Sequence, residues 1–277
     1  MPGWGEKPAP SAEPDEAADA TPLVTFRPAH RWWDIAAVPL LAVAATLLLG
    51  AAVALVYALL HGLSFPELRA AFDRVRDATY VVYGSQIVLY FALAAAIAAL
   101  LALRGYGLRE THFQPVRGRV VFAALVMGVV LAVLAMLLLS VLPEETQRQM
   151  IEQSDLLMPE TVGEAALLLV IAVLLAPLVE ELYFRGIVLR VLGARLPFAG
   201  AAAFTAVFFS LMHGHLFTMP DVAGWVLSGV IFVLGMVLAW LTRWSGSLRP
   251  AIAMHAAYNF VLFMPSIGAM LAAGVQT

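Results

Sequence analysis

The chain has 277 residues, of which 62% are hydrophobic and only 13% are charged, and its net charge is −3. A soluble domain carries about 25% charged residues, so this composition excludes a water-soluble enzyme, and it also excludes a disordered chain. The absence of cysteine excludes disulfides, thiolate zinc sites and a cysteine nucleophile. An α-helical membrane protein with several spans remains. Its basic residues are scattered, which speaks against nucleic acid as a partner.

Residues 1–33 differ in composition from the rest of the chain. They hold six of the sixteen prolines together with five acidic residues, which predicts a disordered N-terminal tail. A cleaved signal peptide does not fit, because the first apolar run, residues 35–60, is far longer than the roughly 7–15 apolar residues of a signal. We therefore expect residues 34–277 to form a transmembrane helical domain.

Seven apolar segments are long enough to cross a bilayer, which takes about 20 helical residues. In chain order they are residues 35–60, 81–103, 120–142, 165–196, 197–216, 222–241 and 248–264. One long helix with charges in its middle explains residues 165–196 better than a helix that stops at Glu180. The short apolar stretch up to Ala273 leaves room for an eighth span. The predicted fold is all-α, a polytopic transmembrane helical bundle of seven or eight spans.

The distribution of basic residues predicts how the chain crosses the membrane. With the N-terminus inside, twelve of the sixteen Lys and Arg residues fall in cytoplasmic segments and four fall outside. Cytoplasmic loops carry an excess of these residues. We therefore expect a multi-pass protein of the cell membrane with a cytoplasmic N-terminus.

The first cluster of ionisable residues within a predicted span is Glu180, Glu181 and Arg185. Such groups cost at least ~2.5–3.5 kcal/mol in a bilayer and are functional candidates for that reason. Glu181 and Arg185 are four residues apart and can form an ion pair, whereas Glu180 points about 100° away and must face another helix. Pro177 predicts a kink just before them. The alternative is a helix that leaves the membrane here, which the apolar residues after Arg185 disfavour.

Two further polar pairs lie on other predicted spans, Phe209 with His213 and His255 with Asn259, each on one helix face. Taken singly, they can be an interfacial histidine and a polar contact between helices. Together with Glu180, the three polar side chains can supply a general base, a water-orienting group and oxyanion donors for peptide hydrolysis. Glu180, His213 and His255 are also candidate ligands for a divalent metal such as zinc, although the H-E-x-x-H spacing is absent.

In this order, the motifs Glu180-Glu181-x-x-x-Arg185, Phe209-x-x-x-His213 and His255-x-x-x-Asn259 resemble those of the CPBP family. These are intramembrane proteases of the type II CAAX prenyl endopeptidase class, with bacterial relatives linked to bacteriocin immunity. The resemblance covers about residues 120–265 as the protease-like core. It implies that Glu180 is the general base, that His213 positions the water, and that His255 and Asn259 are oxyanion donors. Glu181, Arg185 and Phe209 are implied as supporting residues.

The resemblance also implies the partners: a peptide or protein substrate with a membrane-associated C-terminus, and the lipid bilayer. The family has been described both as metalloproteases and as glutamate-dependent proteases, so a catalytic zinc stays open. Two other functions also stay open, a non-catalytic binding or immunity protein on the same scaffold and a proton-coupled transporter that uses Glu180. The lack of the internal repeat found in many transporters weakens the last of these.

The relative depth of Glu180 and His213 is the main difficulty for a common site. Strict alternation of spans places the end of the helix at residues 165–196 inside and His213 toward the outside. The two residues can meet if Glu180 lies near mid-depth, or if the helix around residues 197–200 is tilted or irregular.

Overall fold

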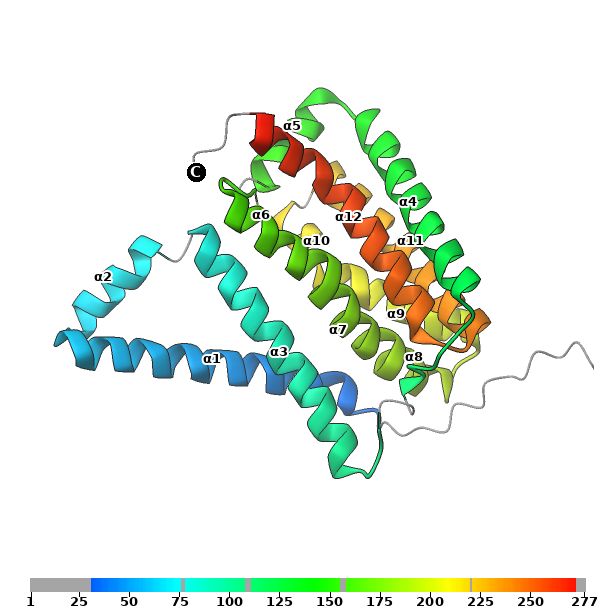
Figure 1. Cartoon of the computed structure of the whole chain (residues 1–277), viewed down its shortest axis with the longest axis horizontal. Helices are drawn as coiled ribbons and strands as arrows, with labels where there is room; N and C mark the ends of the chain where they lie inside the picture. Colours follow the sequence, from blue (N-terminus) through cyan, green and yellow to red (C-terminus); the bar gives the residue numbers. More distant parts are fainter. Residues whose placement is uncertain (1–30, 76–77, 108–110, 155–157, 220, 273–277) are drawn as a thin grey trace, which may run out of the picture.

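The structure is a computed structural model that describes residues 31–75, 78–107, 111–154, 158–219 and 221–272. All the regular elements within these ranges are helices, which confirms the predicted all-α bundle (Figure 1). Of the predicted N-terminal tail, only residues 31–33 fall within the described ranges.

Six helices in the described part of the chain are long and apolar enough to cross a bilayer. They are α1 (Asp34–His61), α3 (Thr79–Leu103), α4 (Gly118–Ser140), the continuous helix Val162–Gly193, α11 (Val222–Ser245) and α12 (Leu248–Ala272). The predicted span at residues 197–216 is the shorter apolar helix α9 (Phe198–Met212). The stretch considered as an eighth span is the end of α12, which continues through Pro265.

Three short helices join these spans: α2 (Phe65–Val75), α5 (Glu144–Ser154) and α10 (His215–Thr218). Helix α1 leaves the bundle at a wide angle to α3, and α2 bridges their separated ends (Figure 1). The start of α1 is fixed to the bundle because Arg104 donates to both carboxylate oxygens of Asp34, at 2.5 and 2.8 Å. The Tyr183 hydroxyl also donates to the Ile35 carbonyl at 2.5 Å.

The helix Val162–Gly193 confirms that one long helix carries the Glu180 cluster, and its winding changes along its length. It consists of α6 (Val162–Leu169), η4 (Val170–Leu175), α7 (Ala176–Tyr183), η5 (Phe184–Val188) and α8 (Leu189–Gly193). The segments η4 and η5 are π-helical, a winding that often occurs at functional sites. Helix α7, which carries Glu180 and Glu181, therefore lies between two π-helical segments.

Pro177 has a defined consequence for the carbonyl groups of η4. Ala176 donates its N–H to the carbonyl of Ile171, five residues earlier, as π-helical winding requires. In the same register the carbonyl of Ala172 would accept from residue 177, but proline has no N–H. Ala172 therefore needs a donor from outside its own helix.

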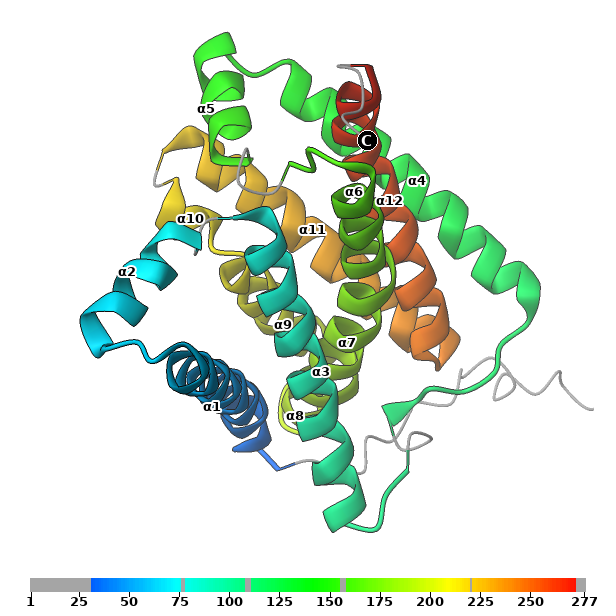
Figure 2. The ribbon, with the colours of Figure 1, turned by 60° about the vertical axis from the view of Figure 1, so that its left-hand side comes forward.

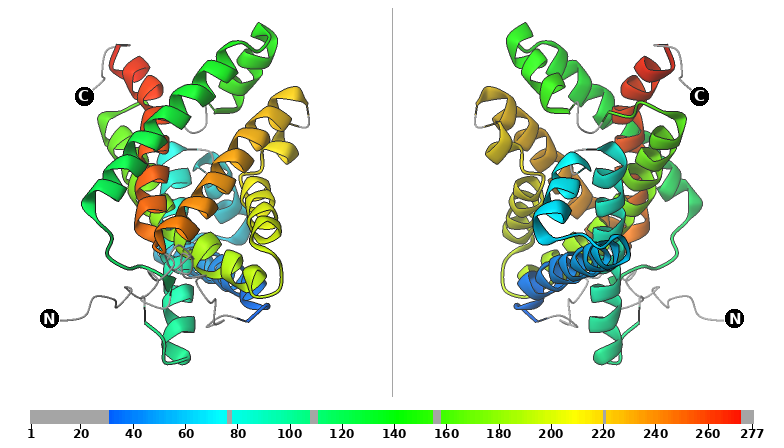
Figure 3. Two further views of the ribbon diagram at one scale, coloured as in Figure 1. Left: turned by 90° about the vertical axis from the view of Figure 1, so that its right-hand side faces the viewer. Right: turned by 90° about the vertical axis from the view of Figure 1, so that its left-hand side faces the viewer.

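The helices around the site pack closely. Helix α9 lies beside α11 (Figure 3), and α4 lies along α12 (Figure 2). Gly128 permits the second contact, because a Cβ atom at this position would lie 2.3 Å from the carbonyl oxygen of Met254. The missing side chain thus sets the distance between α4 and α12.

We expect Gly128→Ala to destabilise the protein by about 1–3 kcal/mol, because the added methyl group forces the backbones of α4 and α12 apart. Thermal unfolding in detergent measures this as a lower midpoint. Gly84→Ala in α3 is the matched control: nothing lies within 4 Å of a Cβ atom there, and alanine favours a helix over glycine by about 1 kcal/mol. An unchanged midpoint for Gly128→Ala would contradict the close contact.

Candidate active site

Glu181 on α7 and Arg185 on η5 form a buried ion pair at the bottom of the site. Arg185 Nη1 donates to Glu181 Oε1 at 2.7 Å, as the four-residue spacing predicts, and both side chains are fully buried. Arg185 Nη2 donates to the carbonyl of Gly235 on α11 at 3.0 Å. The guanidinium also lies 4.7 Å from the centre of the Phe209 ring, within cation–π range. Arg185 therefore joins three helices at one point.

His255 on α12 connects the two adjacent carboxylates. Its Nδ1 lies 3.0 Å from Glu181 Oε1, and since an ionised carboxylate can only accept, Nδ1 is the donor. Its Nε2 faces Glu180 Oε2 at 3.9 Å. That distance is too long for a direct hydrogen bond, and it is one that a water molecule can bridge from the side. Glu181 therefore orients the ring so that its other nitrogen faces Glu180.

Glu180 is the most accessible of these three groups, with a side chain that is 15% exposed. Its Oε1 accepts a hydrogen bond of 2.6 Å from the hydroxyl of Tyr90 on α3. Sequence reasoning did not find Tyr90, which lies 90 residues away in an apolar helix with no recognisable motif. The only signal in the sequence was a hydroxyl within a membrane span, which is common and unspecific.

Asn259 supplies the donor that Ala172 needs. Its Nδ2 donates to the carbonyl of Ala172 at 2.8 Å. In this structure one amide N–H thus ties α12 to η4, which is the helix-joining contact considered as the alternative for this residue. The role of Asn259 as an oxyanion donor stays a prediction, and it would need the second N–H of the same amide.

Phe209 brings His213 to the site. Both imidazoles pack edge-on against its ring, with centroid distances of 4.7 Å for His213 and 5.7 Å for His255. His213 is exposed at the C-terminal cap of α9, and its Nδ1 lies 2.8 Å from the Phe209 carbonyl. Within the described part of the chain, its Nε2 has no hydrogen-bond partner. Burial and then the neighbouring His213 lower the pKa of His215, so His215 is neutral at pH 7.

The three candidate metal ligands do not come together. Within the described ranges, no three His, Asp or Glu side chains gather closely enough to hold a metal ion. Glu180 and His255 face each other, but His213 reaches the site only through the Phe209 ring. As placed here, the residues do not fit a zinc site with three protein ligands.

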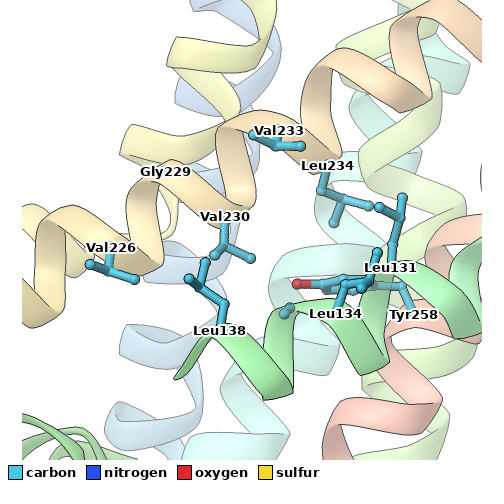
Figure 4. Close-up of a pocket in the computed structure, with 10 residues that line it drawn as sticks. Leu131, Leu134, Leu138, Val226, Gly229, Val230, Val233, Leu234 and Tyr258 are labelled. Atoms are coloured by element: carbon cyan, nitrogen blue, oxygen red, sulfur yellow. The ribbon is translucent and has the colours of Figure 1, made fainter. Parts of the chain in front are cut away.

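A separate apolar groove lies between α4 and α11 and has a volume of about 530 Å³ (Figure 4). Aliphatic residues of both helices line it, and Tyr258 of α12 projects into it. Among the described residues the Tyr258 hydroxyl has no hydrogen-bond partner. No acid or histidine lines the groove, so it is separate from the Glu180 and His255 pair.

A segment in the second half of the chain matches a known protein family. Residues 162–261 match the family model of type II CAAX prenyl endopeptidase Rce1-like proteins. This segment is a Rce1-like domain. It runs from the start of α6 into α12 and contains all three sequence motifs, which confirms the resemblance. No curated protein and no solved structure matches the chain.

The Rce1-like domain begins later than the predicted core at residues 120–265, so α1 to α5 lie outside it. At the family level, the Rce1-like domain is a domain of CAAX-type intramembrane proteases. Six apolar helices of spanning length agree with a multi-pass membrane protein, and the family match agrees with a protein substrate. Tyr90 on α3 is a site residue outside the matched segment.

Proposed function

We propose that the protein is an intramembrane endopeptidase of the CAAX prenyl protease type, in which Glu180 activates a water molecule. The observation that supports this most is the pairing of Glu180 Oε2 with His255 Nε2 at 3.9 Å inside a helical membrane protein. The distance suits a water molecule that contacts both groups. Glu181 holds the ring in this orientation from its other side.

The proposed reaction assigns one task to each polar group. Glu180 takes a proton from the water, and the resulting hydroxide attacks the carbonyl carbon of the scissile peptide bond. The tetrahedral intermediate then collapses: the C–N bond breaks, and Glu180 passes its proton to the leaving amine. The family resemblance implies that His213 positions the water, which requires the end of α9 to approach Glu180 more closely than it does in this structure. His255 and Asn259 donate to the oxyanion that forms. For His255 this requires a proton on Nε2 while Nδ1 also donates to Glu181, so the positive ring would lie between the carboxylates of Glu180 and Glu181.

The substrate in this proposal is a peptide or protein whose C-terminus is associated with the membrane. The protein itself crosses the cell membrane several times and has its N-terminus in the cytoplasm. In this orientation the segment that joins α3 to α4, including Arg104 and Arg117, faces the cytoplasm with most of the basic residues.

We expect His255→Ala and His213→Ala each to lower cleavage by about 10²–10⁴-fold, the usual contribution of a positioned acid–base group. The purified variants are reconstituted in liposomes with a peptide that carries an apolar C-terminal anchor, and mass spectrometry follows the products. His61→Ala is the control, because this ring is exposed at the end of α1. Normal cleavage by His255→Ala would overturn the proposed roles.

A further inference from the structure

Helix α3 lies outside the Rce1-like domain, yet it reaches the general base proposed above. It runs next to the helix that carries Glu180 (Figure 1 and Figure 2). Among the described residues, Tyr90 is the only hydrogen-bond donor to the Glu180 carboxylate, at 2.6 Å. A contact this short is typical of a hydroxyl that donates to a charged oxygen.

The Tyr90 contact distinguishes the two oxygens of Glu180. The last torsion of a glutamate side chain has a broad energy profile, so packing alone holds the carboxylate plane only loosely. With Oε1 bound to Tyr90, Oε2 is the oxygen that faces Nε2 of His255. Loss of the hydroxyl would free the carboxylate plane to rotate away from this alignment.

We propose that Tyr90 is a positioning residue of the peptidase site, which holds Glu180 so that Oε2 faces His255 and the attacking water. The inference rests on the proposed function, because it assigns the role of base to Glu180. It means that the N-terminal helices, which the family match does not include, complete the active site.

A purely structural role for Tyr90 can be separated from this one. Its ring packs with Tyr83, Leu168 and Ile171, and this packing would survive in Tyr90→Phe. The substitution therefore removes the hydroxyl and keeps the ring. Tyr258→Phe is the matched control, since it removes a hydroxyl that has no partner among the described residues, from a buried tyrosine in another span.

We expect Tyr90→Phe to lower kcat by about ten- to a hundredfold, the effect of losing one hydrogen bond to a charged group, with KM unchanged. Tyr258→Phe should cleave the anchored peptide with the wild-type kcat. A wild-type kcat for Tyr90→Phe would overturn the proposal, and so would a loss confined to KM.

A second measurement does not depend on proteolysis. A hydrophobic carbodiimide modifies carboxyl groups within membranes, and peptide mapping by mass spectrometry follows its addition to Glu180. Freed from Tyr90, Glu180 should react several times faster in Tyr90→Phe and at the wild-type rate in Tyr258→Phe. An unchanged rate in Tyr90→Phe would overturn the proposal. If the wild-type protein cleaves no peptide, the proposed function fails, and the labelling rate still decides whether Tyr90 holds Glu180.

Discussion

Glu180→Gln is expected to lower peptide cleavage by about 10²–10⁴-fold while the protein still folds and inserts. Glutamine has the shape of glutamate, and its amide oxygen can still accept from Tyr90, but it cannot take a proton from water. Cleavage of the anchored peptide by protein in liposomes measures the loss. Glu152→Gln on α5 is the control, because this acid is exposed and far from the site in the chain.

Normal cleavage by Glu180→Gln would show that Glu180 is not the base. The same variant also separates the enzyme from a non-catalytic immunity protein on this scaffold. A binding protein would still rescue the phenotype of a deletion strain when it carries Glu180→Gln, whereas the peptidase would not. A transporter would instead lose substrate uptake in proteoliposomes.

Arg185→Ala is expected to destabilise the protein by about 3–5 kcal/mol, because it leaves the carboxylate of Glu181 buried without its cation. The carbonyl of Gly235 also loses its side-chain donor. The folded yield should fall sharply, which the monodisperse fraction in size-exclusion chromatography measures. Thermal unfolding of the remaining protein should show a lower midpoint.

Arg148→Ala is the control for the buried pair. Arg148 contacts Glu145 on the surface of α5, where both side chains are more than half exposed, and exposed pairs contribute only about 0–1 kcal/mol. Its yield should match that of the wild type. If Arg185→Ala also gave wild-type yield and midpoint, Arg185 would have no supporting role, and the link between α7, α9 and α11 would lie elsewhere.

Local patterns in the sequence predicted the helices and the Glu181–Arg185 pair. A membrane span needs a long apolar run, and an ion pair on a helix needs a spacing of four residues. Both features therefore depend only on residues that are close together in the sequence. The same reasoning separated Glu180 from Glu181. In the structure Glu180 accepts from Tyr90 and Glu181 accepts from Arg185, and His255 lies between the two carboxylates. Long apolar runs and short spacings were sufficient for this part of the site.

Contacts between distant residues could not be predicted in this way. The Tyr90 hydroxyl, the Glu181 contact of His255 and the Ala172 contact of Asn259 each depend on how separate helices pack. The depth of His213 was also uncertain, because strict alternation of spans placed it toward the other side. The structure brings it to the site through the Phe209 ring at the end of the short helix α9.

The hydrogen bond from Asn259 to the Ala172 carbonyl couples the substitutions that are tolerated at positions 177 and 259. Pro177 leaves the Ala172 carbonyl without a backbone donor, and the Asn259 amide supplies one. In a related chain without this proline, the Ala172 carbonyl would no longer need Asn259. A descendant that lost the asparagine first would inherit an unsatisfied carbonyl in the hydrocarbon layer. The Ala172 contact alone would therefore allow the amide to be lost only after the proline, whereas the proposed oxyanion role would keep Asn259 in either case.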